Sequence, residues 1–533
     1  MKAPRLLDSA SADILRLDWL AAALAPVSPY GQRRFSELRP FEFGEETEAE
    51  ARAKHVAAVA AAVDDERFDA LRAGLRALPD VAAAVATVAI GGVLDDPAFL
   101  ELHRFCEIVT RIDALVAGLP AVKTVGNDGV AAVGTSLARG ARDGGFYLAD
   151  AFDDELSIAR ERLSREQAEF DASRGREIEA TARELGRDAI ESDEFIVMRS
   201  SLSATLPPGV RVVREAPTYL LCRVEYGERT LAALERRDAA AAAVAAAEEG
   251  VRERLSALAA EHASALHAAA RALGELDVLI AAARFTAIHR CTAATVVAEP
   301  MVLFEEARFL PLEAELRAAG RDFVALDLEL RDAVVLTGPN MGGKSVTLAT
   351  CGFVALCVAF GVPAPARRAS SGLFDQIAWL GMGPRAEVGG LLSSFAREVL
   401  ELKSVLERGS PRLLMLADEF ARTTTPQEGR ALLVALVARL RELRACGIIA
   451  THLAGIAQAA GVAHFAVRGL REIPRRAAHG NVEDALASLA AAMDYRIAEV
   501  GGDERARADA IALAQLLGVD DAFVEAAYRA LAQ

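Results

Sequence analysis

The spacing of apolar and polar positions changes twice along this chain. From Leu15 to Leu119, Ala, Leu and Val recur at helical spacing among charged residues, which predicts several amphipathic helices. Two longer helical stretches follow, at 154–190 and 229–284, and the second runs back beside the first or is broken once in transit. From about Cys291, short apolar runs alternate with helical patterns. That alternation is typical of a parallel sheet with helices on its faces.

The insert between the two long helical stretches has a different period. Residues 195–226 alternate in the manner of strands around Pro207-Pro208-Gly209, which predicts a hairpin-like β structure. Arginines outnumber glutamates in and beside it, so this tip is mildly basic. Two interpretations stay open, solvated charges on a small sheet or a tip that contacts phosphates. The residues concerned are Arg199, Arg211, Arg214, Arg223 and Arg229 against Glu215, Glu225 and Glu228.

Composition narrows the class of partner. The net charge is -16, and of 60 basic residues only five are lysines, so a general basic surface for nucleic acid is absent. A local basic tip could still hold phosphates on an acidic protein. Six cysteines without a C-x-x-C pair indicate buried thiols in a reducing compartment. No signal-peptide pattern and no long charge-free apolar run is present, so we expect a cytoplasmic protein that does not enter a membrane.

The strongest chemical signal is the segment G-P-N-M-G-G-K-S at 338–345. It follows a β-branched apolar run and precedes an apolar helical pattern, which is the context of a phosphate-binding loop. Backbone N–H groups of such a loop surround phosphate oxygens, its lysine reaches the β- and γ-phosphates, and its serine binds Mg²⁺. The sequence therefore predicts binding of ATP with Mg²⁺. The predicted contacts are Gly338, Pro339, Asn340, Met341, Gly342, Gly343, Lys344, Ser345 and Val346.

Two later strands supply candidate catalytic groups. The apolar run that starts at Arg412 ends in Asp418 and Glu419, at the carboxyl end of a strand that we expect beside the loop. Asp418 would bind Mg²⁺ through water, and Glu419 would polarise the attacking water. A third strand ends at His452, which could sense the γ-phosphate or position water. With Lys344, these two residues, Glu419 and His452, are the predicted catalytic set.

A glycine and serine segment, G-G-L-L-S-S-F at 389–395, lies between the loop and the acidic strand and precedes Glu398. Its N–H and hydroxyl groups could meet an anion, although an ordinary helix N-cap is the simpler interpretation of these residues.

Together, T-G-P-N-M-G-G-K-S, S-S-F-A-R-E, L-A-D-E-F-A-R-T-T-T-P-Q-E-G and A-T-H resemble the ATPase domain of the MutS family, in order and spacing. The resemblance is strong over 320–455 and looser over most of the remaining chain. It implies a homodimer with composite nucleotide sites, in which Ser393 completes the partner's site in trans. It also implies that Phe323 stacks on adenine.

The resemblance implies a multidomain α plus α/β architecture, with long helical lever arms, a small β clamp and a P-loop ATPase domain of the ABC type. The expected boundaries are a helical core at 1–150, a lever helix at 151–192, a β clamp tip at 193–228, returning helices at 229–290, the ATPase domain at 291–480 and a helical tail at 481–533, which could serve dimerisation.

Departures from the family pattern suggest what the ATPase acts on. The core pattern begins within the first 20 residues, so we expect no mismatch-reading domain. D-E-F-A-R-T-T-x-P-x-E-G, A-H-F-A-V-R-G-L and M-D-Y-R-I are similar to the MutS-like ATPase subunit of lysine 5,6-aminomutase reactivase, a chaperone for a cobalamin enzyme. A protein-directed ATPase of this kind is the favoured hypothesis. The alternative is a clamp on mismatched, branched or damaged duplex DNA.

Overall fold

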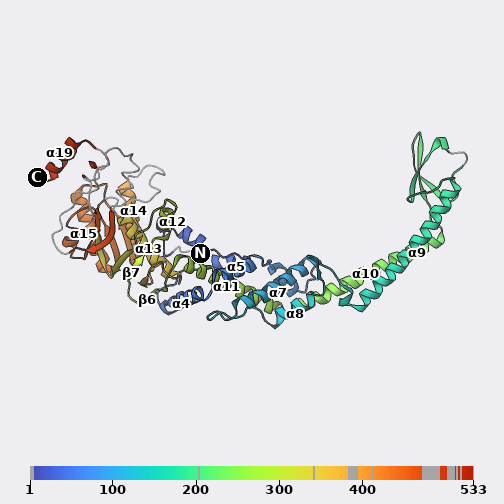
Figure 1. Cartoon of the computed structure of the whole chain (residues 1–533), viewed down its shortest axis with the longest axis horizontal. Coiled ribbons are helices and arrows are strands. Elements are labelled where there is room, and N and C mark those ends of the chain that lie inside the picture. Colours follow the sequence, from blue (N-terminus) through green and yellow to red (C-terminus); the bar gives the residue numbers. More distant parts are fainter. Residues whose placement is uncertain are drawn as a thin grey trace. The chain divides into compact units, whose positions relative to one another are not determined.

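The computed structural model describes residues 5–201, 205–339, 343–381, 394–410, 412–470, 493–500, 511, 514–515 and 519–531. They form two compact units, one from residues 1–77, 114–124 and 271–533 and the other from 78–113 and 125–270 (Figure 1). The predicted mixture of helix and sheet is confirmed. The units cut across the domain boundaries expected from the sequence, because the first 77 residues group with the segment expected to be the ATPase domain. Those boundaries therefore remain predictions.

A mixed sheet forms the centre of the first unit. Its described strands lie in the order β11 (Gln376–Gly381), β12 (Leu413–Asp418), β13 (Cys446–Ala450), β9 (Ala333–Thr337), β14 (His464–Leu470) and β15 (Met493–Glu499). All neighbours are parallel except β14 and β15. The apolar runs of β12 and β13 are buried along almost their whole length, as expected for strands covered on both faces.

The strand register brings the carboxyl ends of neighbouring strands level. Asp418 pairs with Ala450, Ala450 pairs with Leu336, and Gly381 pairs with Asp418. Residues that follow these positions therefore emerge at one edge of the sheet, where ligands bind in open α/β sheets. Within the sheet, β13 lies between the acidic strand β12 and the loop strand β9.

Helices cover the sheet and follow from local sequence signals. Helix α13 (Lys344–Ala359) is almost entirely buried, which explains its apolar sequence. Helix α15 (Pro426–Leu443) begins with proline after Thr425, whose hydroxyl accepts a hydrogen bond from the Glu428 N–H at 3.3 Å. Other described helices of this unit are α14 (Ser394–Arg408), α16 (Ile456–Ala460) and α19 (Asp521–Leu531).

Residues near the start of the chain cover the outer edge of β11. The Ile377 N–H donates to the Leu6 carbonyl at 2.7 Å, and the Trp379 N–H donates to the Ser11 hydroxyl at 2.9 Å. Ser11 lies in α1 (Ser9–Ile14) and is fully buried. The N-terminal segment thus satisfies donors that an edge strand would otherwise expose.

The first unit also contains a smaller sheet and further helices. The sheet order is β6 (Thr295–Val297), β10 (Arg368–Gly372), β7 (Val302–Ala307) and β8 (Leu326–Leu330), with β6 and β10 parallel and the other neighbours antiparallel. The helices are α2 (Leu17–Ala23), α3 (Pro29–Ser36), α4 (Glu46–Ala62), α5 (Asp65–Arg76) and α12 (Leu310–Ala318).

The second unit is built around two long helices, α9 (Asp154–Glu184) and α10 (Glu228–Glu261), which pack together. Asp153 caps α9 by accepting a hydrogen bond from the Glu155 N–H at 2.7 Å. Helix α9 is shorter than the predicted stretch to residue 190, and the returning stretch breaks at His262 before α11 (Ala263–His289). The unit also holds α6 (Ala82–Ala89), α7 (Asp96–Val116), α8 (Asp128–Leu137) and the short strands β1 (Ala141–Arg142) and β2 (Gly145–Phe146).

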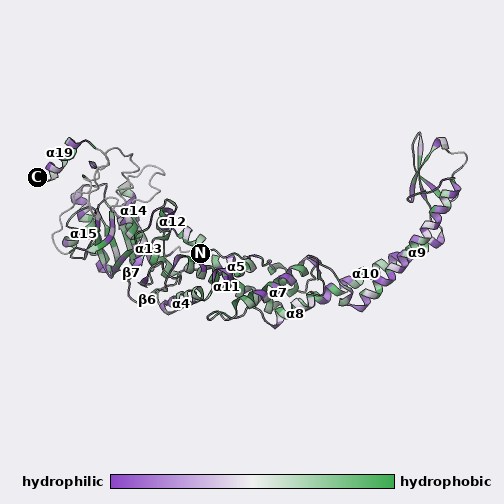
Figure 2. Ribbon diagram, in the orientation of Figure 1, coloured by the Kyte–Doolittle hydropathy of each residue, from purple (hydrophilic) through white to green (hydrophobic). Residues whose placement is uncertain are grey.

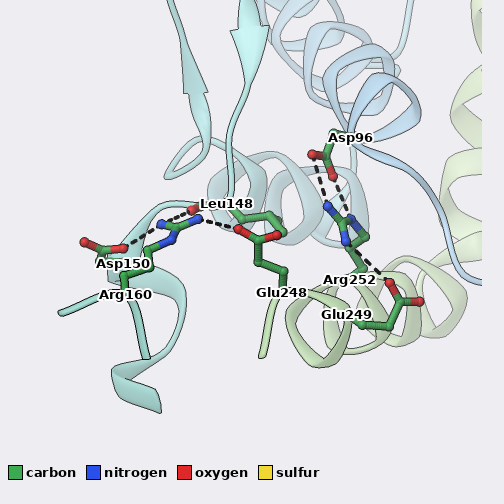
Figure 3. A network of polar contacts seen from close by, with 7 residues as sticks. All are labelled: Asp96, Leu148, Asp150, Arg160, Glu248, Glu249 and Arg252. Carbon is green, nitrogen blue, oxygen red and sulfur yellow. Dashed lines mark hydrogen bonds and ion pairs between the residues drawn. The ribbon is translucent and has the colours of Figure 1, made fainter. Parts of the chain in front are cut away.

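Two arginines tie the helices of this unit together, as Figure 3 shows. Arg160 on α9 donates to the Leu148 carbonyl at 2.7 Å, to Asp150 at 2.6 Å and to Glu248 on α10 at 2.8 Å. Arg252 on α10 donates to Asp96 on α7 at 2.9 Å. Figure 2 shows α9 as a largely hydrophilic helix.

The segment that connects α9 to α10 forms a small antiparallel sheet, called the tip sheet below. Its strands lie in the order β3 (Glu194–Met198), β5 (Tyr219–Val224) and β4 (Val210–Glu215). The hairpin-like structure predicted for this insert is therefore one sheet of three described strands. One face packs toward α9 through Phe195, Val197, Leu220, Cys222 and Val224, with Ile178 and Leu185 against them. The opposite face leaves Ile196 and Met198 about half exposed, at 50% and 46%.

Two further observations concern the whole described chain. All six cysteines are free thiols, five of them buried. No helix within the described residues is both long enough and apolar enough to cross a membrane.

Candidate nucleotide-binding site

The predicted phosphate-binding loop connects β9 to α13. Gly338 and Gly343 have φ angles of 155° and 93°, which glycine adopts readily and other residues rarely. A Cβ on Gly338 would lie 3.0 Å from the Val467 Cβ, so the loop also needs glycine for close packing against β14. Asn340, Met341 and Gly342 lie outside the described residues. The described ends of the loop have the strand and helix context that the sequence predicted.

The Lys344 side chain lies along the backbone of the loop. Its Nζ donates to the Gly338 carbonyl at 2.9 Å and to the Pro339 carbonyl at 3.2 Å, and it lies 3.4 Å from Glu419 Oε1. Only 4% of the residue is exposed. A buried ammonium is stable only with such partners. The lysine is therefore preoriented at the first turn of α13.

Ser345 and Asp418 meet although they are 73 residues apart. The Ser345 hydroxyl donates to Asp418 Oδ2 at 2.6 Å. The other carboxylate oxygen, Oδ1, is buried and has no hydrogen-bond partner. Burial raises the pKa of Asp418, and the hydrogen bond from Ser345 opposes this shift. An orphaned buried carboxylate oxygen beside a hydroxyl is a donor set that suits a hard cation such as Mg²⁺.

Glu419 follows Asp418 on a strained segment. Its φ is 52° and that of Ala421 is 62°, left-handed values that cost non-glycine residues about 1 kcal/mol or more each. The Glu419 N–H donates to the Ala450 carbonyl at 3.0 Å, which fixes the start of the turn. Arg422 donates to Glu419 Oε2 at 3.1 Å. Burial acts to raise the pKa of Glu419, but the hydrogen bond from Arg422 and the charge of Lys344 outweigh it, so the pKa lies below its ordinary value.

A cavity of about 620 Å³ joins these groups. Its polar side is formed by Lys344, Ser345, Asp418 and Glu419, and Arg422 closes it on one flank. The segment from α12 to β8 contributes both apolar residues and the charged residues Arg321 and Asp322, and β15 contributes Tyr495. Volume and lining fit a nucleotide-sized ligand with one charged and one apolar end. The remaining lining residues are Leu312, Leu316, Arg321, Asp322, Phe323, Val324, Leu326, Pro339, Gly343, Val346 and Tyr495.

Most of the predicted site residues that are described lie together. Phe323 and Val346 line the same cavity as Lys344, and the expected stack of Phe323 on adenine stays a prediction. His452 does not line it. This histidine is exposed and lines a smaller neighbouring pocket, which shares Glu419 and Arg422 with the larger cavity. Ser393 lies outside the described residues, so its role in trans also stays a prediction.

Several lining residues were not selected as site residues by sequence reasoning, and Arg422 and Tyr495 are the two closest to the phosphate-binding loop and Glu419. Arg422 stands three positions after Glu419, and that spacing next to a buried acid was a usable signal. Tyr495 had no such signal. It arrives on β15, and a Cβ on Gly343 would lie 3.1 Å from its ring. Only the order of strands in the sheet places this tyrosine beside the loop.

Comparison with known proteins agrees with this geometry. Residues 334–532 match MutS domain V, which is the ATPase domain of MutS proteins. The findings support a MutS-family assignment. A DNA mismatch repair protein MutS from Nitrobacter hamburgensis is 28% identical over 439 residues, which cover 76% of this chain and 48% of that protein. One from Thermus thermophilus is 33% identical over 244 residues, 46% of this chain and 28% of that protein.

A second group of relatives carries a different name. An Endonuclease MutS2 from Pelotomaculum thermopropionicum is 32% identical over 202 residues, 37% of this chain and 25% of that protein. The chain thus matches about half or less of the length of these MutS and MutS2 relatives.

Proposed function

We propose that this chain is a MutS-type P-loop ATPase that hydrolyses ATP and couples hydrolysis to a change of conformation. The observation that carries the proposal is the contact between Ser345 and Asp418, at 2.6 Å, with a buried and unpartnered Asp418 Oδ1 beside it. Lys344 and Glu419 line the same cavity. A module that only binds ATP would not need a carboxylate held beyond the cation-binding pair.

Each side chain has a defined task in this proposal. Lys344 exchanges its loop carbonyl partners for phosphate oxygens, which keeps its buried charge neutralised. Ser345 and Asp418 would hold Mg²⁺, which supplies positive charge to the phosphates when bound. The lowered pKa of Glu419 favours its carboxylate form, in which it would orient and polarise the attacking water. Arg422 keeps Glu419 in place.

Glu419→Gln tests the proposed role most directly. The amide keeps the shape of the side chain but cannot act as a base, so we expect ATP to bind and hydrolysis to fall by at least about 100-fold. Glu428→Gln is a matched control, because Glu428 is an exposed acid at the start of α15. Turnover by Glu419→Gln at the wild-type rate would remove Glu419 from the mechanism.

Homodimerisation is part of the proposal. Ser393 would complete the nucleotide site of the partner, so Ser393→Ala should depress hydrolysis while nucleotide binding by each chain persists. Sedimentation with and without ATP, combined with the rate of each variant, checks this. A wild-type rate for Ser393→Ala would leave that serine as a simple helix cap.

The favoured target of the ATPase is a cobalamin-dependent enzyme, with this chain as the ATPase subunit of an aminomutase reactivase. The net charge of -16 and the M-D-Y-R-I strand, whose Tyr495 lines the nucleotide cavity, support it. The half-exposed Ile196 and Met198 on the tip sheet suit a protein surface. Purified lysine 5,6-aminomutase should bind in an ATP-dependent manner, and Ile196→Ser with Met198→Ser should weaken that binding.

A DNA clamp is the second candidate. Arg211 and Arg214 on β4 are exposed and make no ion pair with other described residues, so they are available to phosphates. Binding to duplex and branched DNA should then weaken steeply with salt, and replacing both arginines by alanine should reduce the slope by about two. Absence of DNA binding at low salt would remove this candidate.

A further inference from the structure

A buried carboxylate on α14 holds the turn that carries Glu419. Glu398 lies one helical turn into α14 and is 5% exposed. Its Oε2 accepts a hydrogen bond of 3.0 Å from the backbone N–H of Ala421. Ala421 and Glu419 are the two non-glycine residues of this turn with left-handed φ angles, 62° and 52°. The bond therefore joins a helix to the most strained part of the candidate site.

The turn depends on contacts from outside itself. Left-handed angles persist in residues with a side chain only where the surroundings hold them. The Ala450 carbonyl holds the start of the turn through the Glu419 N–H, at 3.0 Å. Glu398 holds its end. Without the Glu398 carboxylate the buried Ala421 N–H would lose its acceptor, and the turn would relax to satisfy it.

Glu398 acts at a distance from the ligand rather than on it. It does not line the cavity formed by Lys344, Ser345 and Asp418. Burying a carboxylate is costly, and burial raises the pKa of Glu398. An apolar side chain would fill the same space more cheaply if packing were its sole role. The hydrogen bond to Ala421 is therefore the feature that accounts for an acid at this position.

We propose that Glu398 is a positioning residue for hydrolysis. It holds the turn from Glu419 to Ala421, so the orientation of the Glu419 carboxylate depends on the position of α14. The inference rests on the proposed ATPase function. Helix α14 begins directly after the segment with Ser393, which is expected to reach the partner's nucleotide.

Three variants of the full chain test this. Glu398→Ala removes the acceptor, Glu398→Gln keeps an amide oxygen in its place, and Glu407→Ala removes an exposed acid from the same helix as a control. The readouts are kcat for ATP, the Kd of a fluorescent ATP analogue, and hydrogen exchange of the peptide that contains Ala421. We expect Glu398→Ala to lower kcat at least about tenfold, because misplacing a catalytic group is costly, with a Kd within twofold of wild type. The Ala421 peptide should exchange faster.

The other variants decide between positioning and a merely structural role. Glu398→Gln should recover most of kcat and of the exchange protection, and Glu407→Ala should match wild type. Wild-type kcat and exchange in Glu398→Ala would overturn the inference, and so would a loss of nucleotide affinity equal to the loss of kcat. A wild-type chain without ATPase activity would instead overturn the proposed function itself.

Discussion

The sheet that carries the candidate nucleotide site and the small sheet between α9 and α10 are packed in different ways. In the sheet that carries the candidate nucleotide site, β12 and β13 are buried on both faces, and their reactive side chains lie at or directly after the carboxyl ends of the strands. In the tip sheet, β3 alternates between exposed and buried positions, and one face is open. Full burial fixes where the end groups of a strand lie. Burial of one face leaves the other face exposed, and the alternation of apolar and polar residues does not identify what binds there.

The largest expected effect is the loss of ATPase activity in Lys344→Ala, a change that affects only the region of the candidate nucleotide site. The variant removes the ammonium that the loop preorients, and we expect ATPase activity to fall at least about 100-fold, because transition-state charge loses a buried donor. Lys403→Ala on α14 is the control, since Lys403 is exposed and pairs only loosely with Glu407 at 3.6 Å. A steady-state phosphate release assay suffices. Unchanged activity in Lys344→Ala would sink the assignment of the loop.

A pair of core truncations compares the sheets themselves. Met415→Ala in β12 and Phe195→Ala in β3 each remove a buried side chain and should each cost about 3 kcal/mol in local stability. The two tryptophans of the chain, Trp19 and Trp379, both lie in the first unit, so their fluorescence during urea unfolding reports that unit. Met415→Ala should lower the tryptophan midpoint and the ATPase rate.

Phe195→Ala should behave differently on both counts. We expect the tryptophan midpoint and ATPase rate of wild type, with faster proteolysis around the tip sheet. A lowered tryptophan midpoint in this variant would mean that the tip and the nucleotide-binding unit unfold together, and the contrast between the two sheets would fail as a description of stability.

A smaller effect on stability is expected for Asp418→Asn, and its sign is opposite to that of the effect on activity. Burial raises the pKa of Asp418 in the folded chain, so this group favours folding most below its unfolded-state pKa, and that contribution is lost as pH rises through the folded value. At neutral pH the buried charge is therefore a liability. The asparagine should stabilise the nucleotide-free protein by about 1 kcal/mol and abolish Mg²⁺-dependent hydrolysis. Thermal unfolding at pH 7 with EDTA measures the gain, which should vanish at pH 3.

The smallest expected effect concerns Arg422→Ala. Arg422 lowers the pKa of Glu419 and so counteracts the effect of burial. Removal of Arg422 should therefore raise the pKa of Glu419 and move the acid limb of the ATPase pH profile to higher pH. Arg430→Ala on the exposed side of α15 is the control and should leave the profile in place. An acid limb that stays fixed in Arg422→Ala would show that another group sets it.

The sequence predicted what local pattern determines. The loop, the acidic strand end and the long helices could be located because glycine positions, β-branched runs and helical periodicity are properties of neighbouring residues. The insertion of β13 between β9 and β12 could not, since strand order is not written in any one segment. Tyr495 and the bond from Glu398 to Ala421 escaped for the same reason, because each joins residues through the tertiary fold alone.

The hydrogen bonds between β11 and the residues near Leu6 and Ser11 affect how the chain can be shortened. An isolated fragment of residues 291–533 would lack Leu6 and Ser11, so the Ile377 and Trp379 amides would lose their acceptors. Such a fragment offers a bare strand to its neighbours, and we expect it to self-associate in solution. Adding residues 5–14 back as a separate peptide should restore a monodisperse fragment, with the fluorescence of Trp379 as its reporter.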